Sequence, residues 1–199
     1  MKIVVIGASG TIGRAVVKEL DPRHEIVKVG HRSGDVTVDI TSADSIQRMF
    51  QSIGNVDAVV SAAGSAHFGP LETLTEKEFG IGISHKLMGQ INLVLIGRDF
   101  VNDGGSFTVT SGVLRHDPIY CGAAVTTVNA GLEGFVLGAS IEMPRGIRIN
   151  AVSPEVVEES MEKIGSFFRG HIPVPVSKVA MAYSKSVEGR LTGQVFAAH

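Results

Sequence analysis

Short apolar runs alternate along the chain with longer segments whose apolar residues recur every three or four positions. Lys2–Ile6 is an almost unbroken apolar run, typical of a buried strand, and Thr11–Leu20 carries apolar residues along one helix face. The pattern predicts further strands at residues 25–29, 36–39, 57–61, 106–109, 147–152 and 193–196. It predicts helices after residue 41, near 71–78, and at 80–101, 122–142, 155–168 and 176–188.

Strands that are apolar throughout are buried on both faces, which requires helices above and below the sheet. Strands separated by helices of this length are joined by right-handed crossovers and pair in parallel. We therefore expect an α/β fold of the Rossmann type, a doubly wound parallel sheet of seven strands in three α/β/α layers. No change of composition divides residues 1–199, so we expect one domain, with a short lid or substrate segment at about 155–177.

Composition narrows the class of protein. The 199 residues hold 18 Lys and Arg against 20 Asp and Glu, so a net charge of -2 provides no basic surface for nucleic acid. The single cysteine, Cys121, excludes an internal disulfide, and the seven histidines lack metal-ligand spacing, so no metal is expected. No apolar run reaches the ~18 residues of a membrane span, and the first run is too short for a signal peptide. We expect a cytoplasmic protein with no membrane partner.

Glycine is the unusual component, with 24 residues in the chain. Three of them, Gly7, Gly10 and Gly13, lie between the first strand and the first helix. A bound phosphate requires free backbone N–H groups at a helix N-terminus and no side chain in its way, which glycines at this spacing provide. The turn therefore predicts a dinucleotide site, and the alternative is a set of turn glycines without a ligand. The other contact residues expected in this turn are Ser9, Thr11 and Ile12.

The end of the second strand indicates which dinucleotide binds. An acidic residue there bonds the 2′-hydroxyl of NAD, whereas an arginine accommodates the 2′-phosphate of NADP. The chain has no acid at this point and continues with His31, Arg32 and Ser33. NADP(H) is therefore expected in preference to NAD(H), and the alternative is that Arg32 is an ordinary solvated arginine.

Several motifs together resemble the short-chain dehydrogenase/reductase family, and the resemblance covers nearly the whole chain. The similar segments are residues 7–13, 61–64, 104–111, 130–135, 144–154 and 191–194. The glycine spacing is that of atypical and extended members. The resemblance implies that Asp39 holds the adenine amine, and the alternative is a carboxylate that caps the following helix. It also implies further cofactor contacts from Ile40, Ala62, Ala63, Gly64 and Pro154.

The residues that carry the family's chemistry have changed. In the family, a tyrosine donates a proton during hydride transfer, and a lysine, a serine and an asparagine assist it. Aligned on residues 130–135, these four positions hold, in that order, Val125, Asn129, Gly112 and Lys86. We take Ser111, Lys86 and Asn129 as the catalytic candidates, with Lys86 and Asn129 exchanging roles and Lys86 also contacting the cofactor. The alternatives are that Lys86 is a surface lysine and that Ser111 caps the next turn.

The resemblance implies an oxidoreductase that transfers hydride to or from a small carbonyl or alcohol with non-standard acid and base groups. Two alternatives stay open: a non-catalytic NADP(H) sensor or regulatory protein, and an isomerase or lyase on the same fold. The helices at 80–101 and 122–142 resemble the pair through which family members form dimers or tetramers. Glycines in the second helix lower its propensity, so close packing against the sheet or a second subunit is expected to hold it. We expect a homodimer or homotetramer.

Overall fold

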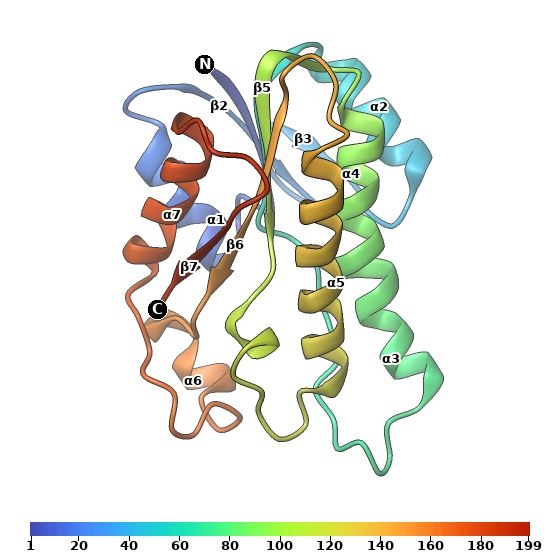
Figure 1. The fold of residues 1–199 in the computed structure, drawn as a ribbon, viewed down its shortest axis with the longest axis vertical. Coiled ribbons are helices and arrows are strands. Elements are labelled where there is room, and N and C mark those ends of the chain that lie inside the picture. Colours follow the sequence, from blue (N-terminus) through green and yellow to red (C-terminus); the bar gives the residue numbers. More distant parts are fainter.

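A parallel sheet of seven strands forms the middle layer of the molecule (Figure 1). The computed structural model describes residues 1–199, and the strand order is β3-β2-β1-β4-β5-β6-β7. The chain winds outward from β1 to β3, returns to β4 beside β1, and winds outward in the other direction, so the predicted doubly wound Rossmann-type sheet is confirmed. The strands are β1 (Lys2–Ile6), β2 (Glu25–Gly30), β3 (Val36–Thr37), β4 (Val56–Ser61), β5 (Val101–Thr110), β6 (Arg148–Pro154) and β7 (Val195–Ala198).

Helices cover both faces of the sheet, as the apolar strands predicted. The helices α1 and α7 pack side by side on one face, and α2, α4 and α5 cover the other (Figure 1). A π-helical segment, Ile83–Met88, joins α3 to α4, so residues 76–97 form one continuous helical rod. The helices are α1 (Thr11–Leu20), α2 (Ala43–Ile53), α3 (Glu76–Gly82), α4 (Gly89–Gly97), α5 (Ala123–Ser140), α6 (Met161–Ile164) and α7 (Val176–Glu188), with 3-10 turns at Val113–Arg115 and Glu158–Ser160.

Each face of the sheet has its own apolar core. Phe107 of β5 lies in the core beneath α2, α4 and α5, where the rings of Phe50 and Phe100 stack with centroids 5.4 Å apart. On the other face, the fully buried Tyr183 of α7 shares a 2.5 Å hydrogen bond with the hydroxyl of Thr110. The two cores hold the strands between them, so the loops that follow β1, β4, β5 and β6 meet at one edge of the sheet.

The helical rod at residues 76–97 ends earlier than its apolar pattern predicted. The helix expected to continue to residue 101 stops at Gly97, and Val101 already begins β5. By length and composition alone the rod is apolar enough to cross a membrane, because an 18-residue window within it has a mean hydropathy of 1.2. Its residues Leu93 and Val94 are buried in the core beside the sheet, but only 28% of the apolar window is buried, and a single helix of this kind is weak evidence of a membrane span.

The prediction of a helix at residues 155–168 is largely wrong. Only α6 and the 3-10 turn before it are helical in this stretch. Val157 instead forms a parallel bridge with Val174, so the chain is extended where a helix was expected. The bridge pairs residues far apart in the sequence, and helical periodicity within one segment cannot reveal such a contact.

Candidate functional site

The glycine-rich turn between β1 and α1 lies where the winding of the sheet reverses, beside the end of β4. Gly7 has a φ of +82°, which favours glycine, and a Cβ there would lie 2.5 Å from the carbonyl oxygen of Ala62. A Cβ at Gly13 would overlap the carbonyl oxygen of Gly7. Helix α1 begins after Gly10 without a side-chain cap, so a bound phosphate can satisfy its first N–H groups.

A cavity of about 450 Å³, the glycine-turn cavity, opens beside this turn. Its lining includes the predicted cofactor residues Gly7, Ser9, Gly10, His31, Asp39, Ile40, Ala62, Ala63 and Gly64. The predicted residues Thr11, Gly13, Arg32 and Ser33 do not line it. Gly13 packs against the turn from behind, whereas Arg32 and Ser33 are exposed in the loop after β2. Sequence reasoning missed the polar lining residues Thr41, Ser65 and His85.

Asp39 lines the glycine-turn cavity with a carboxylate that already has partners. Its Oδ1 accepts hydrogen bonds from the Thr41 backbone N–H at 2.9 Å and from the Thr41 hydroxyl at 2.7 Å. The bond from the hydroxyl is the main reason that the pKa of Asp39 lies below its usual range. The cap of α2 is Ser42, which accepts from the backbone of Ser45, so Asp39 stabilises the turn before this helix and not the helix end.

A second cavity of about 200 Å³, the inner cavity, lies at the carboxyl ends of β5 and β6, against α5. It is lined by the other predicted residues Ile12, Lys86, Ser111, Asn129 and Pro154. Gly10 lines the first cavity and Ile12 the second, so the two cavities flank the start of α1. Sequence reasoning missed Glu155 and Ser160, although Glu155 directly follows Pro154 in the motif. The chain has no cluster of three or more metal-ligating side chains.

Lys86 is the cation of the inner cavity. Its Nζ donates hydrogen bonds to the backbone oxygen of Ser111 and to Oδ1 of Asn129, both at 2.8 Å. Asn129 in turn donates from Nδ2 to the backbone oxygen of Gly112 at 3.2 Å. Lys86 is half-buried as a whole, and the burial of its ammonium lowers its pKa to about 8. The structure thus brings together the three residues predicted as catalytic candidates.

Two local features of the chain place Lys86 at this point. It lies in the π-helical segment between α3 and α4, where the wider turn changes the direction of side chains relative to a regular helix. Gly64, with a φ of +115°, passes directly beside it, and a Cβ there would lie 2.8 Å from the Cα of Lys86. The alternative of a surface lysine is therefore wrong for this ammonium.

The hydroxyl of Ser111 is bound to a group that the sequence did not indicate. Its Oγ donates a 2.9 Å hydrogen bond to Oε1 of Glu133, and Oε2 of the same buried carboxylate pairs with Nε of Arg115 at 3.0 Å. The 3-10 turn that follows, Val113–Arg115, has Gly112 as its N-cap, so Ser111 is not its cap. Glu133 lies four residues after Asn129, on the same face of α5, and that spacing is the signal that could have found it.

No tyrosine reaches the inner cavity. Val125, at the family's tyrosine position, is buried and lines the cavity with an apolar side chain. Tyr120 is 82% exposed in the loop before α5. Tyr183 lies on the other face of the sheet, where burial raises its pKa and its hydroxyl is bonded to Thr110. A proton donor in the inner cavity must therefore be a different type of residue.

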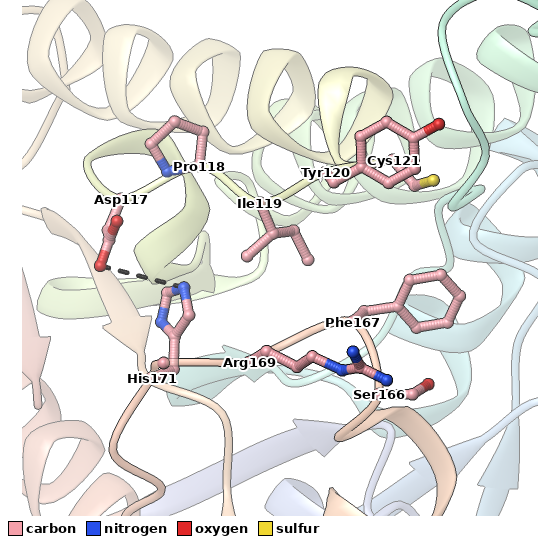
Figure 2. A pocket seen from close by; sticks show the side chains of 10 residues that line it. Asp117, Pro118, Ile119, Tyr120, Cys121, Ser166, Phe167, Arg169 and His171 are labelled. Atoms are coloured by element: carbon pink, nitrogen blue, oxygen red, sulfur yellow. Dashed lines mark ion pairs between the residues drawn. The ribbon is translucent and has the colours of Figure 1, made fainter.

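A third and larger cavity of about 700 Å³, the outer cavity, lies between two loops. The loop after β5 and the loop after α6 face each other across it (Figure 2). His171 and Asp117 meet at one end, with Nε2 and Oδ2 3.9 Å apart. Phe167 lines the outer cavity and Phe168 the inner one, so the loop after α6 separates the two cavities.

A doubly wound parallel sheet with a glycine turn at its reversal point defines a Rossmann-type, dinucleotide-binding class of fold. Residues 3–174 match the family model described as enoyl-(acyl carrier protein) reductase. The chain belongs to the short-chain dehydrogenase/reductase family of oxidoreductases.

Individual relatives agree with this assignment. The chain is similar to the hydroxynaphthalene reductase-like protein Arp2 of Metarhizium brunneum, at 26% identity in an alignment that covers 79% of this chain and 68% of the relative. The crystal structure of the protein lin1944 from Listeria innocua is 53% identical, covers 100% of both chains and has a TM-score of 0.99. A small-chain dehydrogenase in complex with NADPH is 24% identical and shares the fold, with a TM-score of 0.88 over 99% of this chain and 95% of that chain.

Proposed function

We propose that the chain is an NADP(H)-dependent oxidoreductase that transfers hydride to or from a small carbonyl or alcohol. The observation that carries the proposal is Lys86, a buried cation held by Ser111 and Asn129 in a cavity that flanks the glycine turn. Hydride transfer to a carbonyl builds negative charge on its oxygen atom, which a preorganised ammonium stabilises strongly in a buried site.

The residues around the glycine turn fit a dinucleotide. Without side chains at Gly7 and Gly10, and with the start of α1 uncapped, a pyrophosphate can approach the backbone closely. When bound, the nicotinamide supplies or accepts the hydride. We assign the adenine to Asp39 and Ile40, the riboses to Ala62, Ala63, Gly64 and Lys86, and the nicotinamide to Pro154.

The loop after β2 supports NADP(H) in preference to NAD(H). Arg32 is exposed beside His31, which lines the glycine-turn cavity, and it has no ion-pair partner in the protein. A guanidinium recognises a phosphate with two parallel hydrogen bonds. We assign the 2′-phosphate to His31, Arg32 and Ser33, and the NADPH complex of the small-chain dehydrogenase with the same fold agrees with this choice.

Lys86, on the helical rod at residues 76–97, takes the role of the lysine that the family carries at the position of Asn129 on α5. Asn129, at the lysine position, supplies the oxygen that orients the ammonium, so the two residues exchange positions. An ammonium has three donors, and two of them are used by Ser111 and Asn129. We assign the third donor to a ribose or substrate oxygen, and Ser111 to the support of Lys86 through its backbone oxygen.

Two observations favour a second candidate function, a non-catalytic NADP(H) sensor. The tyrosine position is the apolar Val125, and the hydroxyl of Ser111 is already bound to Glu133. A sensor of this kind would bind NADPH in the same cavities and never oxidise it.

Fluorescence titration with NADPH and NADH, followed by nicotinamide absorbance in the presence of a panel of carbonyls, tests the proposal. We expect NADPH to bind more tightly than NADH and to be oxidised by a carbonyl. A preference for NADH would overturn the argument from Arg32, and binding of neither would overturn the cofactor assignment. Binding of NADPH without oxidation by any carbonyl would favour the sensor.

We also propose a cytoplasmic homodimer or homotetramer that forms through α4 and α5. Leu137 of α5 is 66% exposed, Ile141 directly after α5 is 87% exposed, and Leu95 of α4 is 43% exposed. Exposed apolar side chains on neighbouring helices are typical of a subunit contact. Light scattering should give a dimer or tetramer, and a strict monomer would contradict this interface.

A further inference from the structure

Glu155 and His171 form a buried acid–base pair between the inner and outer cavities. Glu155 directly follows β6 and lines the inner cavity, whereas His171 lines the outer cavity. Nδ1 of His171 lies 3.0 Å from Oε1 of Glu155. Only 6% of the His171 side chain and 9% of the Glu155 side chain are exposed. One hydrogen bond therefore connects a residue of each cavity.

Each member of the pair keeps one polar atom free. Oε1 of Glu155 also accepts the Val156 backbone N–H at 2.8 Å, but no protein group bonds its Oε2. Nε2 of His171 faces Asp117 at 3.9 Å (Figure 2), which is too long for a hydrogen bond. Glu155 lines the inner cavity and His171 the outer one, so each cavity is lined by a residue that keeps one polar atom for proton exchange.

The surroundings of the pair suit the transfer of a proton. An imidazole gains and loses a proton near neutral pH, and a carboxylate at one ring nitrogen fixes its orientation. Phe168 packs edge-on against the His171 ring, with centroids 5.3 Å apart. The other charged groups that line the two cavities are Lys86 on the inner side, and Asp117 and Arg169 on the outer side.

We propose that Glu155 and His171 form a proton relay, in which Glu155 exchanges a proton with the reacting oxygen and His171 connects Glu155 to water in the outer cavity. The relay rests on the proposed oxidoreductase function and supplies the proton donor that Val125 lacks. It makes Glu155 a catalytic residue and His171 a positioning and relay residue.

Every proton and electron pair that the relay moves has a defined donor and acceptor. In the reducing direction, the carbonyl carbon gains the hydride, and the electron pair of the C=O π bond forms a new O–H bond with a proton from Glu155. The neutral His171 imidazole then passes its Nδ1 proton to the Glu155 carboxylate while its Nε2 takes up a proton from water in the outer cavity. Proton exchange with water returns the imidazole to the Nδ1 tautomer, and alcohol oxidation runs through the same steps in reverse.

Glu155→Gln and His171→Gln test the relay, with Glu159→Gln as the matched control. Glutamine at position 155 keeps an acceptor for the Val156 N–H, so we expect the fold to be retained, which urea unfolding checks. Glu159 is an exposed acid of the same segment whose carboxylate accepts only the Val176 backbone N–H. The assays are NADPH affinity by fluorescence and kcat across pH with diacetyl, benzaldehyde and phenanthrenequinone.

We expect Glu155→Gln to lower kcat about 100-fold, the size of effect typical of a lost general acid, with unchanged NADPH affinity. His171→Gln should lower kcat about tenfold and flatten its pH dependence, because glutamine cannot pass a proton to Glu155. A purely structural contact would lower kcat by the same factor at every pH. The control variant should match the wild type in both assays.

Nitrogen NMR supplies a readout that does not depend on turnover. In the wild type, neutral His171 should carry its proton on Nδ1, where Glu155 accepts it. In Glu155→Ala the proton should move to Nε2, the tautomer that an isolated imidazole prefers. A wild-type imidazole protonated on Nε2 would overturn the relay, because the Nδ1 proton is the one returned to Glu155.

The remaining outcomes separate the relay from the function on which it rests. If Glu155→Gln keeps kcat within about threefold of the wild type, the relay is overturned and hydride transfer stands. If NADPH binds but no carbonyl oxidises it, the relay and hydride transfer are both contradicted and the sensor function is supported. If NADPH does not bind, the proposed function itself is overturned.

Discussion

Removal of the Lys86 ammonium should change how stability depends on pH. Burial lowers the pKa of Lys86 from 10.5 to about 8, so the charged form is less favourable in the folded chain than in the unfolded one. Below pH 8 the side chain is charged in both states, and the folded state bears the whole desolvation cost. Between pH 8 and 10.5 the folded chain releases its proton first, so this residue makes stability rise with pH.

The size of this effect follows from the difference between the two pKa values. One pKa unit corresponds to ~1.4 kcal/mol, so the fall from 10.5 to about 8 corresponds to about 3 kcal/mol. Lys86→Met removes the charge and also leaves the acceptors on Ser111 and Asn129 without their donor, at about 1–3 kcal/mol each. These two effects oppose each other near neutral pH and leave the variant with no Lys86 titration at higher pH.

Urea unfolding of the wild type and Lys86→Met at pH 7 and pH 10.5 measures the effect. The chain has no tryptophan, so far-ultraviolet circular dichroism is the suitable signal. We expect the stability of the wild type relative to the variant to increase by about 3 kcal/mol between the two pH values. A difference that stays constant with pH would refute the reasoning, because it would mean that the ammonium is solvated.

Three further predictions concern the glycine turn, an ion-pair cluster and the cofactor loop. Gly13→Ala should destabilise the fold by about 3 kcal/mol, because the new methyl group meets the rigid backbone at Gly7, and urea unfolding measures this. Hydrogen bonds, above all from Arg23, lower the pKa of Glu188 to about 2, so its contribution should be present above pH 4.5 and vanish as the pH falls toward 2. Glu188→Gln should therefore be less stable than the wild type at pH 6 and equal to it near pH 2, and parallel unfolding curves would contradict this. Arg32→Gln should weaken NADPH binding about 10–100-fold and leave NADH unchanged, as fluorescence titration can establish.

The sequence predicted those parts of the fold that depend on local periodicity. The boundaries of β1, α1 and α7 agree with their apolar patterns because each element buries one regular face or run. The stretch around α6 failed because Val157 pairs with Val174, a contact between distant residues. The end of the helix at Gly97 was missed because Phe100 and Val101 continue the helical spacing of apolar residues beyond the polar Arg98 and Asp99.

The candidate site shows the same division between local and distant signals. The glycine turn is a local motif, and the changed position of Lys86 follows from alignment with the family. The bond from Ser111 to Glu133 joins residues on a strand end and a helix, and the bond from His171 to Glu155 joins two loops. Neither bond joins residues at a fixed sequence spacing, so the bonds themselves form only in the folded chain, although the spacing of Glu133 from Asn129 places both on one face of α5.

Titration of the wild type and Lys86→Met with NADPH tests the central claim most directly. The account predicts saturable binding to the wild type and at least about tenfold weaker binding to the variant, which loses a charged hydrogen-bond donor while its circular dichroism stays unchanged. Equal affinity of the two proteins, or no binding to the wild type, would contradict the claim that the buried lysine and the glycine turn form one cofactor site.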